Sequence, residues 1–486
     1  SMPGLMGIVL FPLGAATFIY GAILLAYLIA WQYWEFHTGI MVGFTIVAGF
    51  LAWFVNINDV SLGRFYRDRL METFMPDPEI MAPNPETDDG AALTQGMSPA
   101  AAAADQLRLV DLAPSDQAKT NKRPSPLHLV CCNVVAGTRD DAKAQRRFGD
   151  SFVLSELYCG SDTTQWRRTS QVARGNLRLA TAMGISGAAA NPRSGFAGTG
   201  PTTGPVVSFA MAMLSLRLGY WLRWDDRFGW FEKLNPFGNH ISPGLLVALG
   251  RLFSARWLTD EITGFREITD GGHFENLGLY ELVRRRCGLI VVCDGGQDPS
   301  ASYASFTAAQ RRIEEDFGAR IEFDVEIDQH PSNAKKTDMR LSGPQDIVMR
   351  TPETASFPKD VEFAPRGYFL ATIQYSQSRD RDPKAPGCRQ QAAMGPEKGL
   401  LIYLKSTMLD SLKATTKGYR GANEEFPFDP TSNQFFSSVQ FEAYRDVGWA
   451  MTEQMLSETL LERLFDGDRP TIARLLNNYA FGVQRP

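Results

Sequence analysis

The pattern that most constrains the fold lies between residues 266 and 296, REITDGGHFENLGLYELVRRRCGLIVVCDGG. Two short apolar runs each end in Asp-Gly-Gly, at Asp270 and at Asp294, and a helical pattern separates them. Such a unit is typical of two parallel strands joined by a crossover helix. Strand-like and helix-like segments alternate elsewhere too, among them LHLVCCNVV, GNLRLATAM, SFTAAQRRIEEDFG and the strand pair GYFLATIQYS and GLLIYLKS. The sequence therefore predicts an α/β fold around a mostly parallel sheet.

The start of the chain differs from the rest. The first 34 residues contain no charged residue, and a bilayer span needs only about 20 apolar residues. A shorter apolar run, IMVGFTIVAGFLAWFV, follows, and Arg64, Arg67 and Arg69 come soon after it. By the positive-inside tendency, these arginines place the remaining chain in the cytoplasm. We therefore expect residues 1–60 to form a hydrophobic transmembrane hairpin that anchors a cytoplasm-facing body; the alternative is a signal peptide followed by a core helix.

Composition divides the remaining chain into three parts. Residues 61–125 combine an amphipathic segment with a Pro- and Ala-rich linker, residues 126–425 form the expected α/β domain, and residues 426–486 form a helical extension. A net charge of −5 without a Lys/Arg block argues against nucleic-acid binding. The six cysteines have no CxxC spacing and the five histidines are scattered. We therefore expect reduced cysteines and no metal site.

The two Asp-Gly-Gly tripeptides admit two interpretations. The carboxyl edge of a parallel sheet is where catalytic groups gather, and an aspartate there can act as a general base. Alternatively, Asp-Gly is a common turn dipeptide, and aspartate caps helices. We interpret Asp294 as a turn residue. Asp270 is a candidate catalytic residue because of the sequence around it.

That surrounding sequence, DGGHFENLGLYELVRRRCGLIVVCDGG, resembles the region of the catalytic aspartate in patatin-like phospholipases, a family related to the cytosolic phospholipase A2 class. The segments NDVSLGRFYRDRL, LATAMGISGAAANP, LSLRLGYWL and FPFDPTSNQFFSSVQFEAYRDVG are similar to stretches of large bacterial membrane-associated members, so the resemblance covers most of residues 57–450. It implies a three-layer α/β/α core and hydrolysis of phospholipid or related lipid esters by a Ser–Asp dyad, without a cofactor. Asp270 would be the catalytic aspartate, and Gly271 and Gly272 would complete its motif.

The resemblance also implies a nucleophilic serine in a Gly-x-Ser-x-Gly elbow between a strand and a helix. The similar sequence here is GISGA, which places Ser186 at the nucleophile position between Gly184 and Gly187 and departs from the family pattern at Ala188. The preceding RGNLRLATAM has a helical pattern, and no Gly-Gly-Gly-like oxyanion loop comes before Ser186. His273, three residues after Asp270, is a candidate contact for a lipid head group or a packing residue at a helix start.

A second alignment fits the same residues. ATAMGISGAAANP also resembles the Ala-x-x-Ser-x-Ala-x-Pro segment that patatin-like proteins carry between nucleophile and aspartate, and Ser186 would then line or support the site. In the large relatives, the oxyanion loop and the elbow lie ahead of the hydrophobic spans. The chain would then be the carboxyl-terminal portion of such an enzyme, or a pseudo-lipase that binds lipid or a partner. The sequence alone leaves both hypotheses open.

Overall fold

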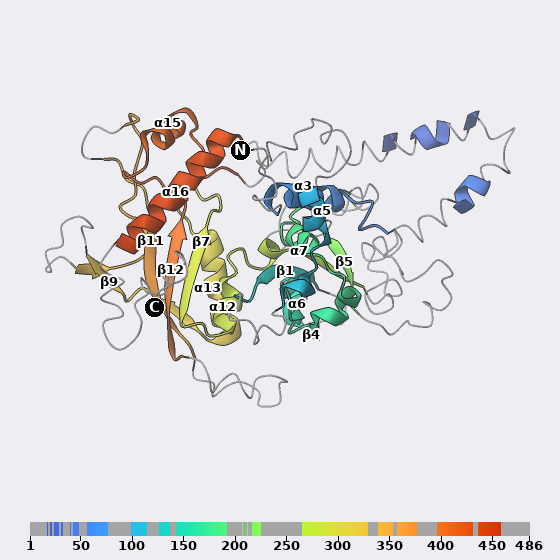
Figure 1. Cartoon of the computed structure of the whole chain (residues 1–486), viewed down its shortest axis with the longest axis horizontal. Coiled ribbons are helices and arrows are strands. Elements are labelled where there is room, and N and C mark those ends of the chain that lie inside the picture. Colours follow the sequence, from blue (N-terminus) through green and yellow to red (C-terminus); the bar gives the residue numbers. More distant parts are fainter. Residues whose placement is uncertain are drawn as a thin grey trace. The chain divides into compact units, whose positions relative to one another are not determined.

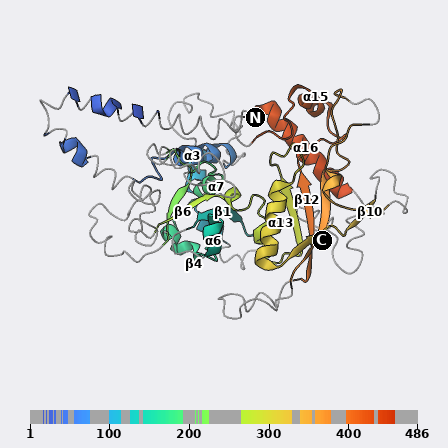
Figure 2. The same ribbon diagram turned by 180° about the vertical axis from the view of Figure 1, so that it is seen from behind.

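The computed structural model describes residues 56–75, 99–113, 126–136, 142–191, 216–224, 265–328, 339–352, 357–376, 396–430 and 436–457, with scattered positions between 17 and 47 and at 207 and 211. These residues belong to two compact units, Ser1–Asn276 and Leu277–Pro486 (Figure 1, Figure 2). The boundary between the units falls inside the single α/β domain expected over residues 126–425.

The first unit contains a six-stranded sheet with the strand order β4-β3-β2-β1-β6-β5. Its strands are β1 (Leu129–Val135), β2 (Gly149–Ser155), β3 (Tyr158–Ser161), β4 (Gln165–Arg168), β5 (Tyr220–Arg223) and β6 (Phe265–Asp270). Its described helices are α3 (Leu62–Phe74), α5 (Pro99–Gln106), α6 (Ala142–Arg146) and α7 (Leu179–Ser186). The 3-10 turns are η2 (Leu109–Leu112), η4 (Thr169–Gly175) and η8 (Gly271–His273). Helix α7 packs against α3, β1 and β6 (Figure 1).

The expectation of a mostly parallel sheet, and with it a three-layer α/β/α core, is wrong. Every strand pair in the six-stranded sheet is antiparallel. The two strands of the expected crossover unit belong to different sheets: β6 lies between β1 and β5, whereas β7 (Leu289–Asp294) lies beside β12 (Lys398–Lys405). A continuous apolar run indicates a strand that is buried on both faces. Strands of a parallel sheet are buried in this way, but so is a central antiparallel strand such as β1. The pattern therefore carries no information about strand direction.

The hydrophobic hairpin expected over residues 1–60 lies largely outside the described residues. The longest described helical stretches before residue 50 cover positions 24–28 and 42–47, whereas a span needs about 20 residues. Within the part of the chain that the structure describes, no helix combines the length and apolarity needed to cross a bilayer. Among the described residues, this finding contradicts the expected transmembrane helix and gives the expected membrane-anchored location no support.

The second unit contains a four-stranded sheet with the order β7-β12-β11-β8. β7 and β12 are parallel, whereas β11 (Tyr368–Gln374) pairs antiparallel with both β12 and β8 (Arg320–Glu322). A separate ribbon joins β9 (Glu326–Asp328) and β10 (Met339–Leu341). The helical elements are α12 (Leu279–Arg284), α13 (Ala304–Phe317), η9 (Pro344–Asp346), α15 (Ala414–Ala422) and α16 (Ser438–Ser457).

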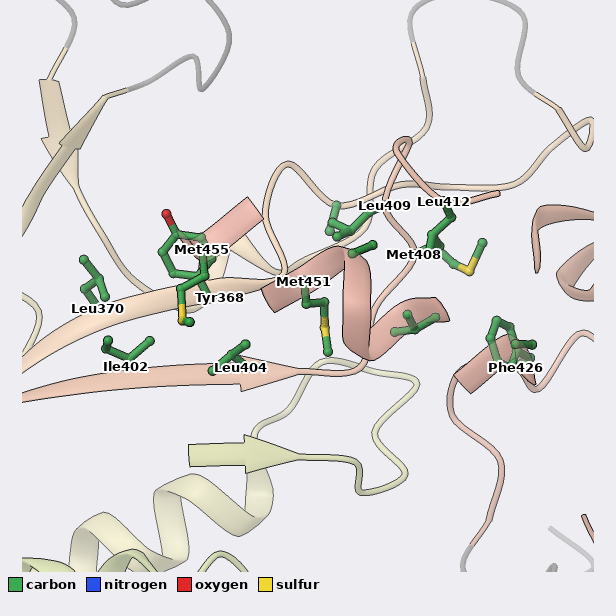
Figure 3. Close-up of a cluster of buried hydrophobic side chains, with 14 of the residues drawn as sticks. Tyr368, Leu370, Ile402, Leu404, Met408, Leu409, Leu412, Phe426, Met451 and Met455 are labelled. Atoms are coloured by element: carbon green, nitrogen blue, oxygen red, sulfur yellow. The ribbon is translucent and has the colours of Figure 1, made fainter. Parts of the chain in front are cut away.

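The core of the second unit lies between its sheet and its carboxyl-terminal helices. Figure 3 shows side chains from β11, β12, α16 and the segments between them: Tyr368, Leu370, Ile402, Leu404, Met408, Leu409, Leu412, Phe426, Met451 and Met455. All of these side chains are buried. The predicted strand pair GYFLATIQYS and GLLIYLKS is confirmed as β11 and β12, which supply the central rows of this core.

Asp294, the aspartate of the second Asp-Gly-Gly, stabilises the turn that it begins. Its carboxylate accepts a hydrogen bond of 2.8 Å from the Gly296 backbone N–H, as expected for a turn residue. It also accepts one of 3.0 Å from the Nζ of Lys405 and one from the Tyr403 hydroxyl. Lys405 is only 3% exposed, so this buried ion pair is a structural feature of the second unit.

The contact between α3 and α7 depends on a glycine. A Cβ at Gly184 would lie 2.9 Å from the Cβ of Arg67, closer than two carbon atoms can pack. Gly184→Ala should therefore destabilise the protein by about 1–3 kcal/mol, even though alanine favours helix more than glycine does. Denaturant unfolding followed by tryptophan fluorescence measures this loss.

Gly418→Ala in α15 is the matched control for this prediction. A Cβ at Gly418 would meet nothing within 4 Å, so the substitution should stabilise by about 0.5–1 kcal/mol. Equal effects of the two substitutions would contradict the close helix packing.

Candidate functional site

Asp270 lies at the end of β6, where the chain turns into η8. Its Cα is opposite that of Cys132 on β1, and its carboxylate accepts a hydrogen bond of 2.6 Å from the Gly272 N–H. A Cβ at Gly271 would lie 2.6 Å from the carbonyl oxygen of Cys131. The first glycine of this Asp-Gly-Gly is therefore required by close approach to β1, and the second supplies the amide that holds the carboxylate.

Ser186, the last residue of α7, reaches the same place on β1. Its Oγ donates a hydrogen bond of 2.7 Å to the carbonyl oxygen of Cys131, the atom next to Gly271. The structure thus brings Ser186 and the Asp270 turn to one backbone carbonyl. The two side chains are not hydrogen-bonded to each other, because the described partner of Ser186 is Cys131 and that of Asp270 is Gly272.

A third group at this place, Tyr66 of α3, was not singled out by the sequence. A Cβ at Gly187 would lie 2.6 Å from the Tyr66 hydroxyl oxygen, so this glycine leaves room for the phenol. Burial raises the pKa of Tyr66, and the charge of Asp270 raises it further. Tyr66 is therefore a neutral hydroxyl close to both Gly187 and Asp270. We refer to Tyr66, Ser186, Asp270 and His273 as the Asp270 cluster.

His273 closes η8 and uses both ring nitrogens. Nε2 lies 3.2 Å from the Ala189 carbonyl oxygen, which can only accept, so Nε2 is assigned the proton. Nδ1 lies 3.0 Å from the Oγ1 of Thr269. Burial lowers the pKa of His273, although Asp270 acts in the opposite direction. The ring is thus neutral near pH 7, and its contacts favour the packing role over a head-group contact.

Asp270 has the electrostatic environment of a proton acceptor. Burial raises the pKa of its carboxyl above the ordinary value, against the lowering effects of the Gly272 N–H and of His273. A carboxylate with a raised pKa accepts a proton more readily at neutral pH, and such shifts are common at catalytic positions. No pattern along the sequence indicates this shift, because it results from neighbours contributed by distant segments.

A buried polar network extends from this cluster into the sheet. The Nδ2 of Asn133 donates to the Oγ1 of Thr269 at 3.1 Å, and the Nδ2 of Asn191 donates to the Oε1 of Glu267 at 2.7 Å. Burial lowers the pKa of Arg217 to about 10, with Glu267 opposing the shift. Sequence reasoning missed these residues. The available signal was Asn133, which interrupts the apolar run LVCCNVV of a central strand.

The surroundings of Ser186 differ from those of a nucleophile elbow. A helix rather than a strand precedes it. The N–H groups of Gly187 and Ala188 donate to carbonyl oxygens of α7, including that of Ile185, so they do not point at an incoming oxyanion. Gly184 and Gly187 both face α3. This arrangement matches the second alignment, in which the serine supports the site.

Comparison with family models and curated proteins identified no relative of this chain. No model of a protein family matches the chain, and no curated protein matches it. The patatin-like resemblance therefore stays a hypothesis that rests on the motif residues quoted above.

The raised pKa of Asp270 predicts a specific pH dependence of stability. A carboxyl whose pKa is higher in the folded than in the unfolded protein stabilises the fold below the unfolded value of about 3.9, and this contribution is lost as the pH rises through the folded value. Asp270→Asn should therefore be more stable than the wild type near pH 7, and the difference should disappear towards about pH 4. Denaturant unfolding across this range measures the effect.

Asp105→Asn is the control of opposite sign. Burial acts to raise the pKa of Asp105, but hydrogen bonds and charges from Arg67 and Arg178 hold it below its ordinary value. Removing this buried carboxylate should cost roughly 3 kcal/mol near neutral pH, because two arginines lose a shared partner. If both variants shifted stability in the same direction at every pH, the electrostatic difference between the two aspartates would be refuted.

Proposed function

We propose that this protein hydrolyses carboxylic esters of lipids, phospholipids among them, with Asp270 as the proton acceptor. One observation carries the proposal: a partly buried carboxylate with a raised pKa lies at a Gly-Gly turn, close to the hydroxyl-bearing residues Ser186 and Tyr66. The motif resemblance supplies the reaction class, acyl transfer through a Ser–Asp dyad, which requires no histidine and no cofactor.

In the proposed reaction, the Ser186 hydroxyl turns from the Cys131 carbonyl towards Asp270. As Oγ attacks the ester carbonyl carbon, its proton passes to Asp270; the ester C–O bond breaks, and the leaving alcohol takes that proton. Water, deprotonated by Asp270, then attacks the acyl-serine, releases the fatty acid and restores the hydroxyl. The neutral Tyr66 hydroxyl is the proposed donor to the oxyanion, because the amides after Ser186 are bonded within α7.

A second candidate is a lipid- or partner-binding protein without a nucleophile of its own. The hydrogen bond from Ser186 to Cys131 favours it, since that bond gives the serine a structural task at the end of α7. The helix before Ser186 favours it as well. In this case Asp270 belongs to a binding surface, or to a site that another segment completes.

Labelling with a fluorophosphonate probe distinguishes the two candidates. Under the hydrolase proposal, the probe attaches to Ser186, and peptide mass spectrometry identifies the adduct. Ser186→Ala should abolish labelling, and Asp270→Asn should slow it by about 100-fold or more, because the proton acceptor is lost. Ser170→Ala, which removes an exposed serine upstream of α7, should label like the wild type. A folded wild-type chain that takes up no probe would refute the self-contained dyad and favour the binding protein.

Tyr66→Phe tests the proposed oxyanion donor. The phenyl ring keeps the contact with Gly187 but loses the hydroxyl. Removal of a single oxyanion donor typically lowers the rate by about 100-fold or more. Hydrolysis of a short-chain p-nitrophenyl ester should therefore fall to about this extent in kcat with little change in KM. An unchanged kcat would remove Tyr66 from the mechanism without affecting the assignment of Asp270.

A further inference from the structure

The two faces of β6 differ in chemistry. Successive side chains of a strand point to opposite faces, so Ile268 and Asp270 share one face of β6. Glu267 and Thr269 share the other face, where the side-chain amides of two asparagines donate hydrogen bonds to them. The asparagine donors of the polar network therefore serve the face of β6 that Asp270 does not share.

Asp270 lies at the end of an apolar row formed by β6 and β1. In the antiparallel register, Val134 is opposite Ile268, and Cys132 is opposite Asp270. Directly opposite residues of such a pair have their Cβ atoms about 4.5–5.5 Å apart on the same face. Cys132, Val134 and Ile268 belong to one buried core, together with Ile185 of α7. The Asp270 carboxylate thus borders an apolar core, which explains why burial raises its pKa.

Cys132 is the residue of β1 that lies directly opposite Asp270. It is only 2% exposed, and its Sγ lies 3.8 Å from the carbonyl oxygen of Val130, to which the thiol donates. Burial raises the pKa of Cys132 well above its ordinary value, and the charges of Cys131 and Asp270 act in the same direction. Cys132 is therefore a neutral thiol near Asp270 whose proton is directed along its own strand.

The other titratable groups near Asp270 come from α3 and η8. The charge of Asp270 adds to the effect of burial in raising the pKa of Tyr66, and His273 acts to lower the pKa of Asp270. Helix α7, LATAMGIS, contributes no titratable side chain. The described hydrogen bond to the carboxylate comes from the Gly272 N–H. The side chain at position 132 therefore determines whether β1 offers this carboxylate a second donor.

We propose that Cys132 is a positioning residue that acts through Asp270: it fills the cross-strand position with a side chain that donates elsewhere, and so keeps the carboxylate a better proton acceptor. A hydroxyl at this position would instead donate to the ionised carboxylate. A hydrogen bond to the charged form favours that form and weakens the base. The catalytic consequence rests on the proposed hydrolysis, whereas the effect on the carboxylate does not.

Cys132→Ser tests the catalytic consequence through the pH profile of Ser186 labelling by the fluorophosphonate probe. The midpoint of the profile should move to lower pH, and the rate above it should fall by about 3- to 10-fold, because a weaker base accepts the proton less readily. A merely structural loss would lower the rate without moving the midpoint. Cys132→Thr carries the same hydroxyl and adds a methyl group, and it replaces the serine variant if that variant does not fold.

Denaturant unfolding tests the effect on the carboxylate without any need for hydrolysis. Asp270→Asn is expected to stabilise the wild type near neutral pH. In the Cys132→Ser background, this gain should be smaller by about tenfold in the unfolding equilibrium constant, since the ionised carboxylate then has a second hydrogen-bond donor.

Cys159→Ser is the matched control. Cys159 is fully buried in the same core as Cys132, but it lies on β3, two strands away from β1. The same chemical change at this position should leave the pH midpoint and the gain from Asp270→Asn as they are in the wild type. Cys132→Ala, which supplies no donor, should leave both unchanged as well.

The proposal is overturned if Cys132→Ser leaves either the pH midpoint or the gain from Asp270→Asn unchanged. It is also overturned if Cys159→Ser or Cys132→Ala alters them as much as Cys132→Ser does. If the folded wild type takes up no probe, the proposed hydrolysis fails, and the unfolding comparison alone decides the role of Cys132.

Discussion

The carbonyl oxygen of Cys131 is the point on which the site depends. It accepts the Ser186 hydroxyl and lies against Gly271, so it fixes the end of α7 and the start of η8 on the same strand. A larger residue at position 271 would push the turn away from β1. Because β1 is paired on both edges, by β2 and by β6, this carbonyl is held by the rigid middle of the sheet. The position of Asp270 follows from that contact.

Helices α3 and α7 contribute to two chemically opposite places. Tyr66 and Ser186 stand beside a carboxylate whose pKa is raised by burial. Arg64, Arg67 and Arg178 line a cavity of about 730 Å³ within the first unit. The helices can approach closely because Gly184 and Gly187 present no side chain to α3. A single packing contact therefore supports both the candidate catalytic residues and this arginine-lined cavity.

The Asp270 cluster contains a residue that opposes the stability of the fold. An ionised, partly buried Asp270 destabilises the fold at neutral pH, whereas Arg67 and Arg178 hold the pKa of Asp105 below its ordinary value. Asp294 forms a buried ion pair with Lys405. A residue that opposes stability and lies in a polar network is the kind of exception that functional sites produce. This is the physical argument for Asp270 over Asp294, which the repeated Asp-Gly-Gly motif alone could not provide.

Local patterns in the sequence determined where many of the elements lie: β1, α7, α13 and the pair β11–β12 occur where the apolar spacing predicts them. Asp270 and Ser186 are candidates that local motifs suggest. Only the tertiary structure decided strand direction, sheet membership and the partners of the site. Side-chain periodicity reports which faces are buried, not which strand lies alongside or in what direction. Tyr66 and the arginines of the cavity reach their places through helix packing between distant segments, and a pattern read along the chain contains no record of that packing.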